Sequence, residues 1–588
     1  MLIFSFAGYS QKSKPDTRFV GLDASFEQVL KDWNAAGFAV AVVEKNKIVY
    51  AKGFGYRDAD KKLPVDANTL FAIGSCTKAF TATLIGMLQK DGKLDIDNLA
   101  TSYLPDLHFY NNEMNNTITL RDMLCHRTGL PRHDASWYLF PSQSRDSLLQ
   151  RIKYMEPTAT VRSRWQYNNW MFMTLGAIDE KLTGDTWEQD VKQKIFMPLG
   201  MTQSNFTIKD LEASNDASLG YSVKEDSIIE KSAYYNIAGM SPAGAINSSV
   251  NEMANWVITW INGGKFTGQQ IIPTSFLTQA ISSQSIMGSA LPSTEKPGLF
   301  FSTYGFGWML SSYNGHYRVE HGGNIDGFSA STSFFPTDSI GIIVLTNQNG
   351  SVVPAIVRNI MADRMLGLKY YDWNADMKKT AEKTKAINDS AEKTATKKIY
   401  LPATHALKFY AGNYLNPGYG NIKLFIKNDS LFASAGNKTL WFRHNNNEVF
   451  DMLEKDSHDG IDTTEDGAQV QFQLNFNGDI ESLSTPFEAE LKPIEFKKQL
   501  DVKEVSKEEI QKYLGDYEIS GATVNIFLKN NTTLFALVPG QPEYELVPVE
   551  KDKFAIKTLT GYFIQFETDT NNKVNGLTFM QPNGNFKA

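Results

Sequence analysis

Ser75 and Lys78 stand three residues apart at the start of an apolar segment with helical periodicity, FAIGSCTKAFTATLIGMLQKDGKL, residues 71–94. A serine hydroxyl is a weak nucleophile until a neighbouring base removes its proton. On a helix, positions i and i+3 share one face, so the two side chains can touch. Burial disfavours the ammonium form of a lysine and lowers its pKa, and the neutral amine can then accept the hydroxyl proton. The pair is therefore a candidate nucleophile and base.

The Ser-x-x-Lys pattern is weak on its own, because the chain contains it twice more, at Ser293 with Lys296 and at Ser390 with Lys393. Both of these copies lie among polar and charged residues, where a lysine stays solvated and protonated. Ser75, by contrast, opens an apolar helix. The alternative that Ser75 and Lys78 are ordinary helix residues stays open on this pattern alone.

Two further polar groups follow in the chain. Tyr167-Asn168-Asn169 lies in WQYNNWMFMTLGAIDEKL, directly before an apolar helix, and His321-Gly322-Gly323 lies at the end of a predicted strand. Ser-x-x-Lys, a second polar triplet and a basic-x-Gly strand together form the set that serine β-lactamases and penicillin-binding proteins use. The structural alternatives are a core tyrosine, a turn asparagine and a strand histidine. The order of the three groups favours the functional interpretation.

On these motifs the chain resembles the serine β-lactamase-related hydrolases of the class C type, a family that includes D-peptidases, carboxypeptidases and esterases. The resemblance runs from about residue 35 to about residue 350. It rests on GSCTKAFTA around Ser75, TLRDMLCHRTGLP at 119–131, the WQYNN triplet, PLGM at 198–201, SPAGAINSSVNEMANW at 241–256, and YGFGWMLS followed by HGGNIDGFSA.

The resemblance implies a covalent acyl-enzyme mechanism. Ser75 would attack a carbonyl carbon, while Lys78 and Tyr167 would share the work of taking its proton and returning it to the leaving group. Which of the two is the base stays open. Asn169 would hold Lys78 or a substrate amide.

The strand at His321 would line one side of the cleft. Gly322 and Gly323 carry no side chain, so a substrate backbone could approach closely there. The resemblance also implies that the backbone N–H groups of Ser75 and Asn324 form an oxyanion hole, whose donors each contribute about 3–4 kcal/mol to the transition state.

His321 departs from the β-lactamase pattern, because those enzymes have a lysine at this position, in Lys-Thr-Gly. A lysine is a permanent positive charge for a β-lactam carboxylate, whereas histidine near pH 7 is mostly neutral. This departure favours a peptidase or esterase over an efficient β-lactamase.

The elements that position these residues can be predicted from the pattern. GFAVAVVEKNKIVYAKGFG, from residue 37, predicts two strands joined by a turn, and further strands are expected between 316 and 350. Helical segments such as VNEMANWVITWINGG fill the middle. This order, with strands first, helices next and strands last, predicts an α+β fold in which the first and last strands of an antiparallel sheet meet and helices pack on the sheet. The family resemblance implies the β-lactamase and penicillin-binding-protein type of this fold, which has an additional helical subdomain.

The chain beyond this domain contains an internal repeat. Tyr410-Ala-Gly-Asn-Tyr414 is echoed by Tyr513-Leu-Gly-Asp-Tyr517, and short alternating strands follow each copy. The repeat predicts two small all-β modules, which resemble lipocalin-like domains. The expected organisation is a truncated export signal and leader at 1–20, a serine hydrolase domain at 21–370, a charged linker at 371–400, and β modules at 401–500 and 501–588.

Composition excludes several classes of protein. The formal net charge is -7 and the pI is near 5.8, so no basic surface for nucleic acid is expected. Cys76 and Cys125 are the only cysteines, which excludes a disulfide framework or a cysteine-built metal site, and Cys76 is expected to be inert core. The eight histidines are scattered and the acidic loop at 456–467 does not fit the calcium pattern, so neither a metal nor a cofactor is expected. No apolar run is long enough to span a membrane.

The predicted function is that of an exported, periplasmic or secreted serine hydrolase acting on small peptides or esters, with cell-wall peptides among the candidate substrates. Homo-oligomers are a further expectation by analogy. The alternative is a penicillin-binding receptor or scaffold that acylates slowly and signals or binds through its β modules.

Overall fold

The computed structural model describes residues 16–224, 227–288, 298–394, 400–436, 438–456, 460–461, 467–476, 478–519, 521–530, 532–559, 561–581 and 584–587. The chain forms two compact units, Met1–Lys397 and Lys398–Ala588. Most of the expected export signal and most of the acidic loop at 456–467 lie outside the described residues.

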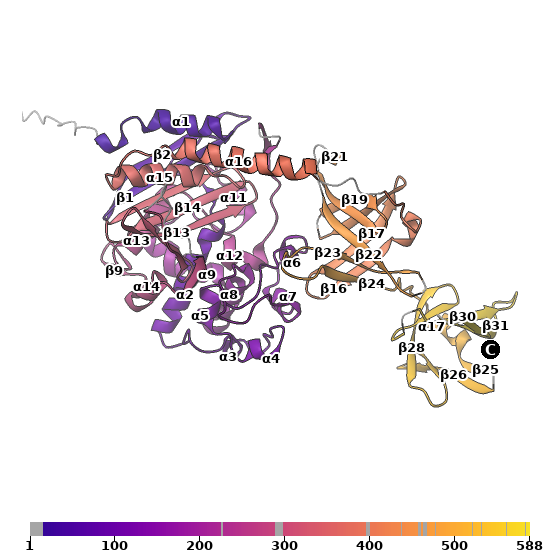
Figure 1. Ribbon diagram of the computed structural model, residues 1–588. Helices are drawn as coiled ribbons and strands as arrows, with labels where there is room; N and C mark the ends of the chain where they lie inside the picture. Colours follow the sequence, from indigo (N-terminus) through magenta and orange to yellow (C-terminus); the bar gives the residue numbers. More distant parts are fainter. Residues whose placement is uncertain are drawn as a thin grey trace, which may run out of the picture. The chain divides into compact units, whose positions relative to one another are not determined.

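A central antiparallel sheet organises the first unit (Figure 1). Its strands are, in spatial order, β10 (Ser285–Gly288), β11 (Ser302–Tyr304), β12 (Met309–Tyr313), β13 (His316–Ile325), β14 (Phe328–Phe335), β15 (Ile340–Thr346), β1 (Gly37–Glu44), β2 (Lys47–Asp58) and β3 (Leu63–Pro64). β1 pairs with β2 on one edge and with β15 on the other. The predicted hairpin and the predicted meeting of the first and last strands are therefore confirmed.

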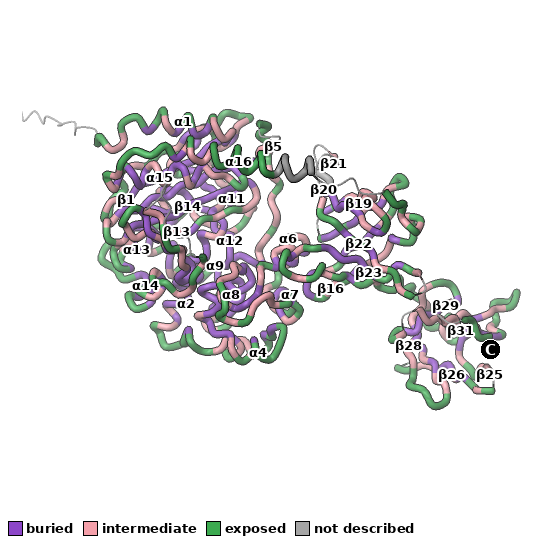
Figure 2. The backbone as a smooth tube through the Cα atoms, viewed as in Figure 1, coloured by how far each residue is buried: buried purple, intermediate pink, exposed green. Residues whose placement is uncertain are grey.

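Both faces of the sheet are buried, which explains the continuous apolar run of β1. Its odd-numbered side chains, such as Ala41, join the larger hydrophobic core, and its even-numbered ones, such as Val40, join a second core. Helices α1 (Leu22–Asp32) and α15 (Val353–Met365) contribute to the second core, whereas α2 (Lys78–Lys90) and α13 (Val250–Ile261) contribute to the larger one. The sheet is thus a middle layer between two helical layers (Figure 2).

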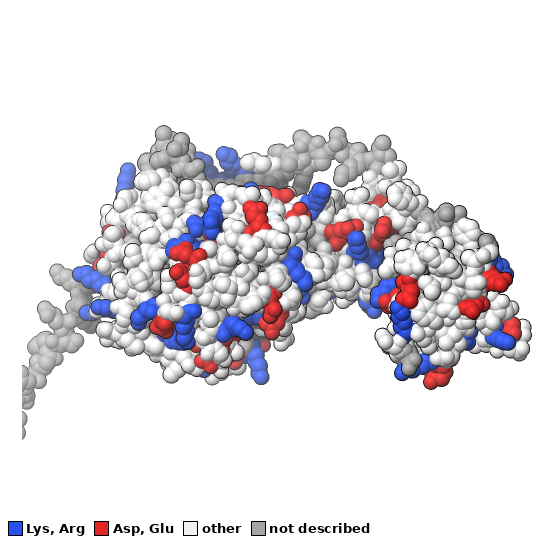
Figure 3. Space-filling model, turned by 90° about the horizontal axis from the view of Figure 1, so that it is seen from below, with Lys and Arg blue, Asp and Glu red and all other residues white. Residues whose placement is uncertain are grey.

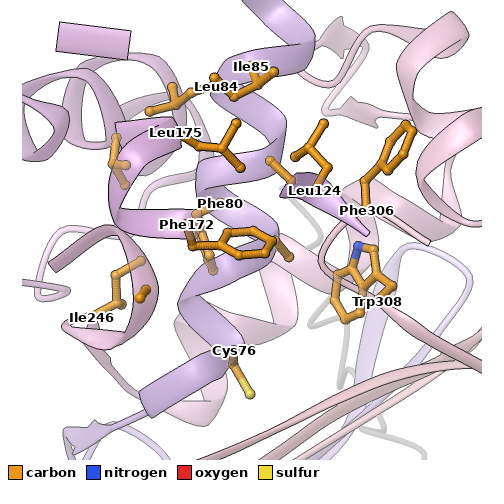
Figure 4. Close-up of a cluster of buried hydrophobic side chains, with 14 of the residues drawn as sticks. Cys76, Phe80, Leu84, Ile85, Leu124, Phe172, Leu175, Ile246, Phe306 and Trp308 are labelled. Atoms are coloured by element: carbon orange, nitrogen blue, oxygen red, sulfur yellow. The ribbon is translucent and has the colours of Figure 1, made fainter. Parts of the chain in front are cut away.

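Helix α2 runs through the larger core and is buried on nearly every side. Side chains from several elements surround it, including Leu124, Phe172, Ile246 and Phe306 (Figure 4). Phe80 stacks on Trp256 of α13 with ring centroids 4.1 Å apart. Burial of this many apolar side chains fixes the axis of α2, and with it the position of Lys78 at its first turn.

A helical subdomain packs against α2 and supplies Asn169 and Ala243, which contact Lys78. It contains α5 (Leu120–Leu124), α8 (Asn169–Thr183), α9 (Trp187–Val191) and α12 (Ser241–Gly244). Gly176 lets α8 approach α12 closely, since a Cβ there would lie 2.2 Å from the Pro242 ring.

The first unit also contains shorter elements. The helices are α3 (Ala100–Tyr103), α4 (Asn112–Asn115), α6 (Ala135–Tyr138), α7 (Arg145–Leu149), α10 (Met197–Leu199), α11 (Ile208–Ala213) and α14 (Thr274–Ala280). The paired short strands are β4 (Phe71–Ala72) with β7 (Asn247–Ser248), β5 (Tyr221–Lys224) with β6 (Ile228–Lys231), and β8 (Lys265–Phe266) with β9 (Gln269–Gln270).

Residues of the expected charged linker form α16 (Trp373–Thr394), whose first turn packs through Trp373 on the second core. The second unit then contains two all-β modules, as predicted. Pairing of β19 with β20 closes the first module into a barrel. Its strands are β16 (Gly412–Asn416), β17 (Gly420–Lys427), β18 (Ser430–Ala435), β19 (Lys438–Asn446), β20 (Val449–Asp456), β21 (Gly460–Ile461), β22 (Ala468–Leu474), β23 (Ile480–Thr485) and β24 (Ile494–Lys498).

The second module is an eight-stranded antiparallel sheet in which each strand pairs with the next. After α17 (Lys507–Ile510) its strands are β25 (Gly515–Ile519), β26 (Ala522–Lys529), β27 (Thr533–Leu537), β28 (Glu543–Glu550), β29 (Lys553–Ile556), β30 (Phe563–Thr568), β31 (Val574–Gln581) and β32 (Gly584–Lys587). The first tyrosine of each repeat is a buried core residue, and the two make equivalent bonds: the Tyr410 hydroxyl donates to Glu448 at 2.6 Å, and the Tyr513 hydroxyl donates to Asp552 at 2.7 Å.

The described surface shows no concentration of one charge on the face in view, where basic and acidic side chains alternate (Figure 3). Among the described helices, none has the length and apolar character required to cross a bilayer.

Candidate active site

Ser75 lies on a short 3₁₀ turn, Gly74–Thr77, which we call the nucleophile turn. The turn connects β4 to α2, and β4 is anchored by pairing of Phe71 with Ser248 and of Ala72 with Asn247. Gly74 has a φ of +51°, and a Cβ there would lie 2.8 Å from the backbone N of Asn324. Only glycine fits a left-handed position in such close contact with β13. Ser75 is thus held on a tight turn ahead of the helix rather than inside it.

Lys78 is fully buried, and its amine is surrounded by three oxygen atoms. Nζ lies 2.7 Å from Asn169 Oδ1, 2.7 Å from the Ala243 carbonyl oxygen and 3.0 Å from Ser75 Oγ. Desolvation holds the pKa of Lys78 well below its usual value of 10.5, and the nearby Arg132 adds to this, while Asp134 opposes it. The amine therefore favours its neutral form.

The three neighbours of the amine define its proton arrangement. A neutral amine has two N–H donors and one lone pair. The Asn169 and Ala243 oxygens are acceptors only, so they take the two N–H groups. The lone pair is left for Ser75, whose hydroxyl is the one neighbour of the three that can donate. This arrangement makes Lys78 the group that can take the proton of Ser75.

Tyr167 contacts the same serine oxygen from another direction. Its hydroxyl donates to Ser75 Oγ at 2.7 Å. Burial raises the pKa of Tyr167, so the side chain is a neutral phenol and a proton donor. The ring packs beside the buried His126, with ring centroids 4.5 Å apart, and Lys78 Nζ lies 4.8 Å from its centre.

A hydrogen-bonded chain of polar groups extends from Lys78 to the protein surface. Asn169, the first residue of α8, donates from Nδ2 to Asp134 Oδ1 at 2.9 Å, which fixes its amide with the oxygen toward Lys78. Asp134 also accepts from Arg132 Nε at 2.6 Å. The Arg132 guanidinium lies 4.9 Å from the centre of the Tyr167 ring, and its side chain is 55% exposed. Arg132 and Asp134 are therefore positioning residues that act through Asn169 and Tyr167.

β13 closes the other side of the nucleophile turn. A Cβ on Gly323 would lie 1.9 Å from the Ile73 carbonyl oxygen and 3.2 Å from the backbone N of Ser75. The close approach at Gly323 is thus made by the protein's own turn. Gly322 is exposed, and a Cβ there would meet only the Ala330 carbonyl oxygen, at 3.6 Å. The backbone nitrogens of Ser75 and Asn324 lie beside the same contact, where an oxyanion hole is expected.

His321 lies in the middle of β13 rather than at its end, and it is 1% exposed. Nε2 lies 3.0 Å from the Tyr304 hydroxyl and Nδ1 lies 2.6 Å from the Gly322 carbonyl oxygen. Nδ1–H therefore donates to the carbonyl, and Nε2 accepts from Tyr304. Desolvation and the proximity of Lys78 lower the pKa of His321 to about 4, so the ring carries no positive charge near neutral pH.

Cys76 and Cys125 are buried free thiols. Burial raises the pKa of Cys76 to about 11, and its Sγ donates to the His321 carbonyl oxygen at 3.2 Å. Cys76 is thus an inert thiol behind the nucleophile. Within the described residues, no cluster of His, Cys, Asp and Glu could hold a metal ion.

The structure brings together all of the residues that the sequence predicts for the site and adds others. Arg132 and Asp134 directly follow the TLRDMLCHRTGLP motif, but nothing in their spacing from Asn169 indicates the contact. The Ala243 carbonyl carries no side-chain signal, and Tyr304 is the first residue of the YGFGWMLS motif, which does not indicate its contact with His321.

Comparison with known families identifies residues 22–363 as a Beta-lactamase domain and residues 397–498 as a domain of unknown function, DUF3471. The first match spans more than half of the chain, so this protein belongs to the beta-lactamase family, whose members are serine hydrolases. The predicted family and fold are confirmed.

Among curated relatives, the Unguisins hydrolase ungD' of Aspergillus campestris is 30% identical over 448 residues, which covers 71% of this chain and 80% of the relative. Protein flp of Staphylococcus aureus is 24% identical over 341 residues, covering 58% of this chain and 65% of the relative. The structure of the octameric penicillin-binding protein homologue from Pyrococcus abyssi has a TM-score of 0.54 at 20% identity and covers 81% of this chain and 100% of that chain. This last likeness shows the fold.

Arg132 and Asp134 shift the pKa of Lys78 in opposite directions, so their replacement should shift the pH dependence of Ser75 reactivity in opposite directions. Arg132→Gln removes a positive charge, so the pKa of Lys78 rises and Ser75 becomes reactive only at higher pH. Asp134→Asn removes a negative charge and moves the same midpoint to lower pH. We expect displacements of about half to one pH unit. The rate of Ser75 labelling by a fluorophosphonate, followed against pH, measures the midpoint.

Arg164→Gln, at an exposed arginine shortly before Tyr167, is the control and should leave the midpoint unchanged. Midpoints that move in the same direction in both test variants would contradict the assigned roles.

The adjacent glycines of β13 provide a second, matched test. Gly323→Ala pushes a methyl group into the Ile73 carbonyl, which displaces the nucleophile turn, so we expect the labelling rate of Ser75 to fall by about 10²-fold or more. Gly322→Ala has room for its methyl group and should stay within about threefold of wild type. Melting temperatures of both variants show whether the fold is kept. Equal losses in the two variants would rule out a specific role for the Gly323 contact.

Proposed function

We propose that this protein is a serine hydrolase that cleaves a peptide or ester bond through a covalent acyl-enzyme on Ser75. The observation that carries the proposal is the pair of contacts at Ser75 Oγ: the buried amine of Lys78 at 3.0 Å and the hydroxyl of Tyr167 at 2.7 Å. One contact can remove the serine proton and the other can supply a proton to a departing group.

In the proposed first step, the Ser75 hydroxyl proton passes to Lys78 Nζ as Oγ bonds to the substrate carbonyl carbon. The new ammonium keeps its bonds to Asn169 and the Ala243 carbonyl. Asp134, which Asn169 contacts, stabilises the positive charge electrostatically. The buried lysine therefore carries a positive charge only while it holds the proton taken from Ser75.

The carbonyl oxygen becomes an oxyanion in this step, and the backbone N–H groups of Ser75 and Asn324 are the proposed donors to it. The bond to the leaving group then breaks, and the departing nitrogen or oxygen takes a proton from the Tyr167 hydroxyl, which Lys78 replenishes. Lys78 is neutral again, and the acyl group remains on Ser75.

Deacylation uses the same groups in reverse. A water molecule attacks the acyl carbon and gives its proton to Lys78, directly or through Tyr167. The tetrahedral intermediate collapses, Ser75 Oγ recovers a proton from Lys78, and the carboxylic acid departs. Atoms and protons balance over the cycle without a cofactor.

One observation supports peptides or esters over β-lactams as substrates. His321, where β-lactamases of this type have a lysine, is buried and has a pKa of about 4, so it offers no permanent charge to a β-lactam carboxylate. The relative from Aspergillus campestris is named Unguisins hydrolase ungD', which supports hydrolysis as the reaction class.

Intact-mass measurement on the purified protein tests the proposal. We expect a fluorophosphonate to add one adduct that Ser75→Ala abolishes, with a loss of reactivity of at least about 10³-fold, because among the described residues no other group beside Lys78 and Tyr167 is an activated nucleophile. Penicillin should leave little or no adduct. A long-lived, Ser75-dependent penicillin adduct would favour the slowly turning-over receptor instead. Fluorophosphonate labelling that survives in Ser75→Ala would overturn the assignment of the nucleophile.

A further inference from the structure

Arg132 places an exposed guanidinium beside the candidate active site. The residue belongs to the segment between α5 and α6, and its side chain is 55% exposed. The guanidinium carbon lies 4.9 Å from the centre of the Tyr167 ring, and the hydroxyl of the same ring donates to Ser75 Oγ. A substrate that contacts both Ser75 and the Tyr167 hydroxyl therefore lies close to Arg132.

Two contacts hold the Arg132 guanidinium in place without using its outer donors. Nε donates to Asp134 Oδ2 at 2.6 Å, and the group lies against the Tyr167 ring in a cation–π contact. Within the part of the chain that the structure describes, neither Nη1 nor Nη2 has a hydrogen-bond partner. Four of the five N–H donors of a guanidinium are on these two nitrogens, so they remain for a ligand.

The carboxylate of Asp134 fixes the guanidinium but does not cover it. Its Oδ1 accepts from Asn169 Nδ2 at 2.9 Å and from Trp137 Nε1 at 2.8 Å, and its Oδ2 accepts from Arg132 Nε. Both oxygens of Asp134 are thus already hydrogen-bonded, and its side chain is less exposed than that of Arg132, at 27%. A second carboxylate can pair with the outer donors of Arg132 without displacing Asp134.

Arg132 is also the permanent positive charge among the basic groups near Tyr167. Lys78, His126 and His321 lie close to the same ring, but burial lowers the pKa of each of them, to about 4 for His321. An arginine keeps its charge throughout the pH range in which enzymes work. An anionic group that approaches Tyr167 near neutral pH therefore finds its positive partner in Arg132.

The role of Tyr167 decides which half of the substrate meets Arg132. In the proposed function the Tyr167 hydroxyl protonates the departing atom, which must lie within hydrogen-bond reach of it. In a peptide, the carboxyl carbon of the released residue lies about 2.5 Å from the departing nitrogen. The carboxylate of a released C-terminal residue would thus lie beside the Tyr167 ring, where the outer donors of Arg132 are.

We propose that Arg132 determines specificity by binding a carboxylate on the leaving group. The preferred substrates are then peptides that lose their C-terminal residue as a free amino acid, or esters that carry a carboxylate in the equivalent place. The inference rests on the proposed function, because it assigns the leaving-group side of the same site. A guanidinium and a carboxylate can form two parallel N–H···O bonds, which gives direction as well as attraction.

The carboxylate of penicillin does not fit this role in the same way. The fused rings of penicillin fix its carboxylate relative to the scissile bond, whereas the C-terminal residue of a peptide can rotate about its N–Cα bond and turn toward Arg132. The weak labelling by penicillin that follows from the neutral His321 is therefore still expected.

The phenylacetate esters of phenol and of 3-hydroxybenzoic acid test the proposal, because they share an acyl group and differ by a carboxylate on the leaving group. A carboxylate at the meta position hardly changes the basicity of the departing phenol. We expect kcat/KM of the carboxylated ester to exceed that of the phenyl ester by about five- to thirtyfold. An equal or lower kcat/KM for the carboxylated ester would overturn the proposal.

Variants of Arg132 assign the preference to its guanidinium. In Arg132→Gln the ratio of the two kcat/KM values should fall to about one, and in Arg132→Lys, which keeps the charge but not the paired donors, it should be intermediate. The ratio cancels the effect of Arg132 on Lys78, because the same groups cleave both esters. Arg164→Gln removes another exposed arginine near Tyr167 and should keep the wild-type ratio. A wild-type ratio in Arg132→Gln would overturn the proposal.

Fluorophosphonate labelling separates this proposal from the proposed function. Loss of Ser75 labelling in wild type would remove the proposed function itself. Normal labelling, together with a ratio that Arg132→Gln leaves unchanged, would remove only the assignment of Arg132.

Discussion

The uncharged state of the buried Lys78 amine is the constraint on which the rest of the site depends. An ammonium in the same place would donate to all three of its oxygen neighbours and leave no lone pair for the serine proton. Burial supplies the neutral form, and the cost of burying the amine is reduced because Asn169 and the Ala243 carbonyl satisfy its two N–H groups. The polar chain through Asp134 to Arg132 then keeps the Asn169 amide in the one orientation that serves this purpose.

The fold places four separate segments around that amine. α2 provides Lys78 and is immobilised by the larger hydrophobic core, α8 provides Asn169 at its first turn, α12 provides a backbone carbonyl, and β13 closes the turn that carries Ser75. The close approach of these segments requires small residues where they touch, which is why Gly176 and Gly323 have no room for a side chain. The same close contacts hold the scaffold together and position the catalytic groups, so a methyl group at Gly323 would disturb both the packing and the chemistry of the site.

The sequence predicts the family, the α+β sheet with its first and last strands paired, and the two all-β modules, because hydrophobic periodicity and motif order are local signals. It also predicts the residues that the structure gathers at the site, from Ser75 and Lys78 to His321. It does not predict that the Ile73 carbonyl lies against Gly323 and keeps a substrate away from that side. It also does not predict the hydrogen bonds that Asp134 makes with Asn169 and Arg132, or the one between Tyr304 and His321. These contacts depend on backbone atoms or on residues far apart in the chain, so neither spacing nor residue type reveals them.

Direct titration of Lys78 tests whether its buried amine is neutral when Ser75 reacts. With lysines labelled at the ε-carbon, the resonance of Lys78, assigned by its loss in Lys78→Arg, reports the protonation of the amine by NMR. We expect a midpoint well below 10.5, with the amine neutral at the pH where Ser75 reacts with a fluorophosphonate. A midpoint near 10.5, with Ser75 still reactive at neutral pH, would contradict it and would assign the removal of the serine proton to another group.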